Sequence, residues 1–186
     1  MIYKTLALLS LFFVSGESKR ILDFNYFSLE APDHWVSISQ QGIDSFVGGI
    51  AIGKGDTLHF DYGNYSWKLD ESLDFYISND SVYIPQKNED KNDTIHRYVN
   101  KFYRLTKDID WESLKKQYIF YENISDKKAK ISVPKKIGNG FTGVYFENVS
   151  TKYKNKRLAI YGSDLGPENH RAFLEAIKTI KFKVLD

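Results

Sequence analysis

Cysteine is absent from this 186-residue chain. Its absence excludes disulfides, thiol catalysis, Cys-ligated zinc and a lipid anchor on an acylated cysteine. The chain also lacks an excess of charge of either sign, because 26 basic and 24 acidic side chains leave a net charge of only +2. Such a balance gives no general reason to expect a nucleic-acid partner. A chain of this length can be held together by a hydrophobic core alone.

A long hydrophobic run is missing too, but a short one lies at the N-terminus. Lys4 precedes the apolar residues 6–14, and small residues follow at 15–16. Even residues 2–14 would form a helix only about 20 Å long, against a membrane core of about 30 Å. We therefore expect a signal peptide at residues 1–16, cleaved before Glu17, with no transmembrane segment in the mature chain. Residues 17–186 are then one exported domain, periplasmic or secreted.

Five Asn-x-Ser/Thr sequons leave the source of this exported protein open between two alternatives. They lie at Asn64, Asn79, Asn92, Asn123 and Asn148. A secreted eukaryotic protein could carry glycans there. Because small secreted eukaryotic domains usually contain disulfides, the lack of cysteine favours a bacterial protein instead.

Most of the chain has the alternating apolar pattern of short strands. We expect strands at 24–29, 35–38, 46–52, 58–62, 73–77, 81–84, 95–105, 129–133, 141–148 and 157–161. Breaks rich in Gly, Asn and Asp separate them, which favours antiparallel hairpins.

Two segments are expected to be helical. Asp110 can cap a short helix that runs to Gln117. A second helix begins at Gly166-Pro167, with Phe173 and Ile177 on one apolar stripe. The predicted fold class is α+β: a single antiparallel sheet with a C-terminal amphipathic helix packed on one face.

The two ends of this domain resemble the PsbP-like fold. The shared features are an early FSLEAPDHW segment at 27–35 and a final amphipathic helix that runs into TIKF at 179–182. The resemblance implies a small exported accessory or scaffold domain rather than an enzyme. It carries over no site residue.

Two glycine-rich segments match nucleotide-binding patterns but lack the required context. Residues 138–143 satisfy GxGxxG, yet the β-branched and aromatic residues that follow favour a strand, whereas a dinucleotide site needs a helix there. Residues 48–54 begin like a phosphate loop, but Gly55 stands where Ser or Thr would bind magnesium. We expect a hairpin turn and a strand respectively, and no cofactor.

His59 and Asp61 are the candidate catalytic pair. They are two residues apart on an expected strand, so both side chains point to one face. The pair could act as an oriented general base or supply two metal ligands, as in a small hydrolase-like enzyme. The alternative is a solvent-facing polar edge, and we predict no metal site.

Tyr62, Tyr65 and Trp67 are the candidate ligand-binding residues. They surround a Gly-Asn turn among Asn and Ser side chains. Exposed rings with polar neighbours suit a sugar or a peptide. The alternative is that these rings close one end of the core.

Charge is polarised along the chain. Residues 17–100 hold 7 basic and 14 acidic side chains, whereas residues 101–186 hold 18 and 10. Two basic runs are expected to form a patch for an anionic partner, or else a solvated face without one: Lys127, Lys128, Lys130, Lys135 and Lys136, then Lys152, Lys154, Lys156 and Arg157. Lysine dominates over arginine, which argues against specific reading of nucleic-acid bases.

The sequence thus favours an exported non-enzymatic accessory domain that binds a glycan, an anionic surface or an envelope protein. Two alternatives stay open: the hydrolase-like enzyme based on His59 and Asp61, and a structural subunit of an envelope assembly.

Overall fold

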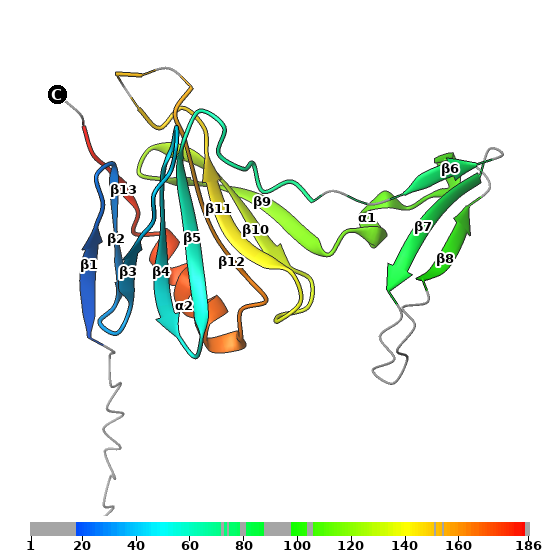
Figure 1. The fold of residues 1–186 in the computed structure, drawn as a ribbon, viewed down its shortest axis with the longest axis horizontal. Helices are drawn as coiled ribbons and strands as arrows, with labels where there is room; N and C mark the ends of the chain where they lie inside the picture. The colour runs from blue at the N-terminus through cyan, green and yellow to red at the C-terminus, as the bar shows by residue number, and fades with distance from the viewer. Residues whose placement is uncertain are drawn as a thin grey trace, which may run out of the picture.

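A seven-stranded antiparallel sheet forms the centre of the molecule (Figure 1). The computed structural model describes residues 18–71, 73, 75–78, 81–87, 98–103, 106–150, 152–153 and 155–184. In spatial order the strands are β3 (Val36–Ser39), β4 (Phe46–Gly53), β5 (Asp56–Gly63), β12 (Arg157–Ser163), β11 (Phe141–Phe146), β10 (Lys127–Pro134) and β9 (Gln117–Ile124). The edges of this sheet are therefore β3 and β9.

A second layer covers one face of this sheet, which we call the inner face. It consists of α2 (Pro167–Ile177) and a three-stranded sheet of β1 (Lys19–Asp23), β2 (Phe27–Pro32) and β13 (Lys181–Phe182). Phe27 from β2 and Phe173 from α2 are almost fully buried in one cluster with Leu58 and Ile160 of the large sheet. Burial of these side chains between the two layers provides the main hydrophobic core.

A third sheet lies at one side of the molecule (Figure 1). It is made of β6 (Tyr76–Ser78), β7 (Ser81–Lys87) and β8 (Tyr98–Tyr103). The chain returns from it through a 3-10 turn, η1 (Thr106–Asp108), and the short helix α1 (Trp111–Leu114). A small cluster of its own joins Val82 and Ile109 to the partly buried Trp111 and Leu114.

The prediction of antiparallel strands with helices is confirmed, but the prediction of a single sheet is wrong. The described residues form three sheets instead of one. The β1–β2 hairpin folds over the inner face because Leu22, Phe27 and Leu29 have apolar side chains to bury there. The C-terminal helix therefore shares its layer with a second sheet.

Local patterns predicted several elements well. Along β5, Leu58, Phe60 and Tyr62 are buried whereas His59 is exposed, as the alternation requires. The GxGxxG segment begins in the turn of the β10–β11 hairpin, where Gly138 has a φ of 81° that few other residues adopt, and its last three residues start strand β11. The residues of the supposed phosphate loop mostly belong to strand β4.

Helix α2 begins as predicted, whereas α1 is shorter than expected. Gly166 is the N-cap of α2 and Pro167 its first residue. In α1, the Asp110 carboxylate accepts a hydrogen bond from the Ser113 backbone, but the helix ends at Leu114. Residue 117 already belongs to strand β9, a strand that no sequence pattern predicted.

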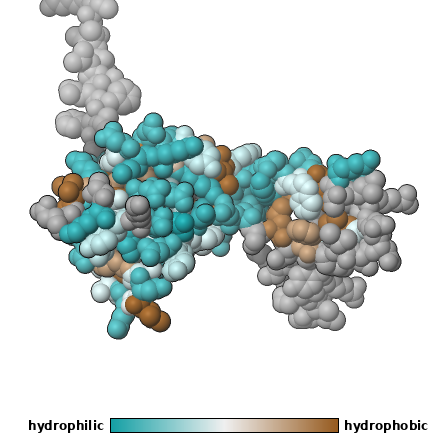
Figure 2. All heavy atoms as spheres, turned by 90° about the horizontal axis from the view of Figure 1, so that it is seen from above, coloured by the Kyte–Doolittle hydropathy of each residue, from teal (hydrophilic) through white to brown (hydrophobic). Residues whose placement is uncertain are grey.

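Several predictions concern residues outside the described part of the chain. The expected signal peptide at 1–16 lies there, as do Lys154 and the sequons at Asn79 and Asn92. None of the helices that the structure describes is long and apolar enough to cross a membrane. Seen from above, hydrophilic residues dominate the surface of the part of the molecule that contains the seven-stranded sheet (Figure 2).

Candidate functional site

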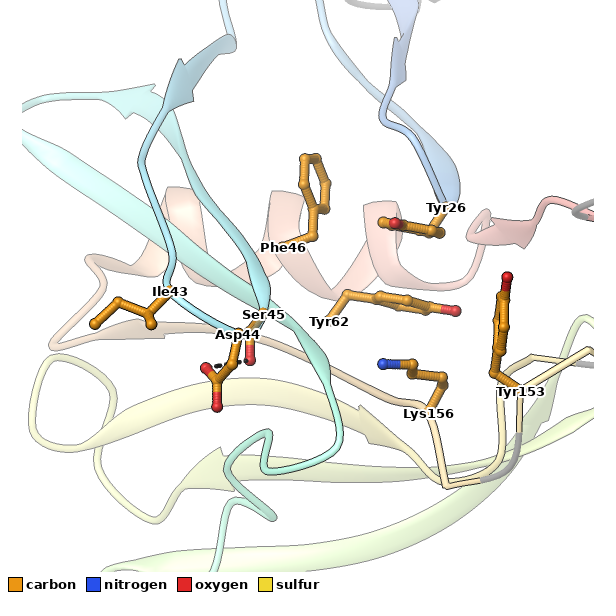
Figure 3. Close-up of a pocket in the computed structure, with 8 residues that line it drawn as sticks. All are labelled: Tyr26, Ile43, Asp44, Ser45, Phe46, Tyr62, Tyr153 and Lys156. Carbon is orange, nitrogen blue, oxygen red and sulfur yellow. Dashed lines mark hydrogen bonds between the residues drawn. The ribbon is translucent and has the colours of Figure 1, made fainter.

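A pocket of about 540 Å³ opens at one end of the core layer (Figure 3). Four segments that are far apart in the sequence meet there: the β1–β2 turn, the β3–β4 connection, the end of β5 and the β11–β12 loop. We call it the tyrosine pocket. It is lined by Tyr26, Ile43, Asp44, Ser45, Phe46, Tyr62, Tyr153 and Lys156. The volume falls within the range of small-molecule sites.

Two stacked tyrosines form the floor of the tyrosine pocket. The rings of Tyr26 and Tyr62 are 4.1 Å apart and within 5° of parallel. The Phe46 ring meets Tyr26 edge-on at 5.4 Å. Tyr62 is only 5% exposed, so it supports the Tyr26 ring from the core side. The partly buried Tyr26 then provides the aromatic surface at the opening. Figure 3 shows the parallel pair, with Tyr153 and Lys156 projecting from the neighbouring loop.

Ser150 connects this floor to the β11–β12 loop. Burial raises the pKa of Tyr62 above its usual range, while a hydrogen bond from the Ser150 hydroxyl opposes that rise. The Tyr62 hydroxyl therefore stays neutral at ordinary pH. Ser150 Oγ also accepts hydrogen bonds from the backbone nitrogens of Lys152 at 3.2 Å and Tyr153 at 3.0 Å. These bonds hold the loop that carries Tyr153 over the pocket.

The rim of the tyrosine pocket carries polar groups of different kinds. Tyr153 is 50% exposed, Asp44 is exposed, and Ser45 and Lys156 are partly buried. Among the lining residues, Lys156 is the single cation and Asp44 the single carboxylate. Flat aromatic surface with an ammonium, a carboxylate and hydroxyls around it can bind a small ligand that is both ring-shaped and polar.

The structure does not bring the three predicted aromatic residues together. Tyr62 lines the tyrosine pocket, whereas Tyr65 is 81% exposed beyond the end of β5. Trp67 lies on the outer face of the large sheet, where it packs against Phe141 at 4.7 Å and Tyr161 at 4.9 Å. The chain crosses from one face to the other after Gly63, so the rings diverge although they are close in sequence.

His59 and Asp61 lie on the outer face, as their spacing predicted. The His59 ring is 5.8 Å from that of Tyr161. Burial raises the pKa of Asp61, and hydrogen bonds from the hydroxyls of Ser45 and Ser66 act against that rise. Oδ1 of the Asp61 carboxylate is buried without a hydrogen-bond partner, and no hydrogen bond to His59 is present among the described residues.

The predicted lysine patch is divided between two ends of a hairpin. One group lies at the end of the sheet where β10 and β12 both begin; it comprises Lys127, Lys128, Lys152, Lys156 and Arg157. The other group, Lys135 and Lys136, follows the last residue of β10. The eight residues of β10 separate these groups by about 26 Å.

Several of these basic side chains already bind neighbours. Lys130 pairs with Asp70, Lys135 Nζ donates to the Glu112 carbonyl at 2.6 Å, and Arg157 Nη1 donates to the Asn64 carbonyl at 2.8 Å. Lys128 and Lys130 also line a second hollow of about 480 Å³ on the outer face, with Tyr121 and Glu147.

Sequence reasoning found two residues of the tyrosine pocket, Tyr62 and Lys156, but assigned them to different surfaces. It missed Tyr26, Phe46 and Tyr153. Composition held a signal, because 13 Tyr and 13 Phe are many for a chain of this size. Nothing local, however, shows that Tyr26 and Tyr62 stack.

No family model, no curated protein and no solved structure matched this chain. The resemblance to PsbP-like proteins therefore stays a prediction. Within the described ranges, no group of three or more His, Asp and Glu side chains could hold a metal ion.

Proposed function

We propose that the chain is an exported, non-enzymatic binding domain that takes an acidic sugar in the tyrosine pocket. The stacked pair of Tyr26 and Tyr62 beneath an opening that holds Lys156 is the observation that carries this proposal. The leader at residues 1–16 and the resemblance to PsbP-like accessory domains support export and the absence of catalysis.

Aromatic walls favour a sugar ring as the ligand. The C–H face of a pyranose is flat and apolar, so it can cover the exposed part of Tyr26 and Tyr153. Its hydroxyls need hydrogen-bonding partners around the same site. Ser45 and Asp44 provide a hydroxyl and a carboxylate at the rim. Because Tyr62 is fixed by the core and by Ser150, little of the floor has to become ordered when a ligand binds.

The charge around the opening favours an acidic sugar over a neutral one. Lys156 lines the pocket and forms no ion pair with the described residues. A uronate carboxylate placed beside it would gain a charge-assisted hydrogen bond. Lys152 lies in the same loop, so the positive potential extends beyond the pocket.

The experiment compares two forms of one ligand by calorimetry and thermal unfolding. Oligosaccharides of polygalacturonate carry carboxylates, and their methyl esters have the same rings without the charge. The acidic form should stabilise the protein by about 2.7 kcal/mol at 100 times its dissociation constant, which raises Tm by roughly 5–10 °C. The esters should bind more weakly, and salt should weaken only the acidic form.

Three variants locate the site. Tyr153→Ala and Lys156→Met should each weaken binding at least tenfold without lowering the Tm of the free protein. Tyr65→Ala removes an exposed tyrosine that lies outside the pocket, so it should bind like the natural chain. Equal binding by all three variants, or no binding of either ligand form, would contradict the proposal.

A further inference from the structure

The edge strand β9 presents a long row of apolar side chains to solvent. Its only strand partner among the described residues is β10. Four consecutive residues are exposed: Tyr118 at 59%, Ile119 at 39%, Phe120 at 39% and Tyr121 at 58%. Exposed apolar side chains normally occur singly on the surface of a soluble protein, so a contiguous set on an open edge indicates an interaction surface.

The usual protection of an edge strand is missing from β9. Natural sheets shorten their edge strands, bend them with bulges, or place Pro or charged side chains, most often Lys, on them. β9 is eight residues long, pairs in unbroken register with β10, contains neither Pro nor Lys, and has Glu122 near one end as its single charged residue. The opposite edge, β3, is protected in the first way, because it has only four residues.

We propose that β9 pairs with β9 of a second copy of this chain, antiparallel and about a two-fold axis normal to the sheet. Such an axis places one residue opposite its own copy, so that equivalent faces of the two sheets stay on the same side. The two seven-stranded sheets would then join into one continuous sheet.

We place Phe120 on this axis, a register that pairs apolar side chains and differs from one centred on Tyr121. Phe120 then faces its own copy, and Ile119 faces Tyr121 of the second chain, so apolar side chains meet on both faces. An axis at Tyr121 would instead set Phe120 opposite Glu122 and Ile119 opposite Asn123. Cross-strand aromatic and aliphatic pairs stabilise a sheet, whereas those mixed pairs would leave apolar groups opposite polar ones.

Charge supports the same register. With Phe120 on the axis, Glu122 lies opposite Tyr118 of the second chain. Lys135 Nζ lies 5.4 Å from the centre of the Tyr118 ring, so it comes close to that carboxylate. Glu122 forms no ion pair within the described part of its own chain. The second copy thus supplies a cation to Glu122 at both ends of the interface.

The first test measures the mass of the full mature chain by light scattering and sedimentation over a wide range of concentration. The natural chain should have the mass of two chains at high concentration. Ile119→Lys should have the mass of one, because a charge then lies in the new strand pair. Ile38→Lys is the matched control, since Ile38 is also 39% exposed on an edge strand, and it should remain a dimer.

The second test uses the absence of cysteine in this chain. Phe120→Cys should form a disulfide-linked dimer under mild oxidation, because opposite Cβ atoms are about 4.5–5.5 Å apart in a strand pair. Tyr118→Cys should not, since it would lie about 13 Å from its own copy in this register. The proposal would be overturned if the natural chain stays monomeric at every concentration. This holds also if its β9 edge binds extended peptides instead of a second copy. Cross-linking of Tyr118→Cys but not Phe120→Cys would overturn it as well.

Discussion

The glycine pair in β4 allows a strict test of how the core is packed. Gly48 faces Phe60 across the strand pair, and a methyl group at Gly48 would lie 2.6 Å from Phe60 Cε1 and clash with Cζ. The ring cannot swing away freely, because it packs against Phe24 at 4.8 Å, Phe27 at 5.3 Å and Phe46 at 5.4 Å. Gly48→Ala must therefore disturb an aromatic cluster.

The adjacent glycine supplies the matched control. Overpacking of a core typically costs about 1–3 kcal/mol, so Gly48→Ala should lower Tm by about 2–12 °C. A methyl group at Gly49 would have its nearest neighbours at 3.4 Å, close to ordinary van der Waals contact. Gly49→Ala should leave the free energy of unfolding unchanged, or raise it by about 0.4–1 kcal/mol through the entropy of the unfolded chain.

Urea unfolding followed by fluorescence and circular dichroism gives both free energies. The Phe60→Leu change should relieve part of the loss in Gly48→Ala, since the two substitutions act at one contact. Gly48→Ala should also weaken ligand binding, because Phe46 contacts both Phe60 and Tyr26 of the tyrosine pocket. A Gly48→Ala protein as stable as Gly49→Ala would refute this reasoning.

Two further predictions concern α2. Burial lowers the pKa of His170, whose Nδ1 is 2.7 Å from Thr142 Oγ1, so the unfolded chain binds the extra proton first. The free energy of unfolding should therefore fall as pH drops below the ordinary histidine pKa of about 6.5, and His170→Gln should reduce that dependence in urea titrations at several pH values. Asn169 is buried and donates to Asp56 Oδ2 at 2.7 Å. Asn169→Ala should cost about 1–3 kcal/mol in the same assay, whereas Glu168→Ala, which removes an exposed ion pair, should change Tm little.

Elements with a clear local pattern could be predicted from the sequence. The period-two alternation of β5 correctly separated buried Phe60 and Tyr62 from exposed His59. Pro167 after Gly166 marked the start of α2 because proline suits the first position of a helix. Such signals depend only on residues a few positions apart.

Strand β9 was missed because it lacks that alternation. Its apolar residues are consecutive and exposed on both faces of an edge, so neither a period of two nor one of 3.6 is visible. The expected helix to Gln117 also overlaps the first residue of this strand. A run of aromatic and β-branched residues was the remaining signal for a strand.

The tyrosine pocket could not be derived from local patterns. Strand spacing determined that Tyr62 points to the same side as Phe60, and composition determined that aromatic rings would be plentiful. Only the tertiary structure decided that this side is the covered one, and that Tyr26 and Lys156 meet Tyr62 there while Trp67 lies on the other face. The physical reason is that alternation assigns a residue to a face, whereas the register between distant strands and the hairpin folded over them decides which faces are buried and which loops become neighbours.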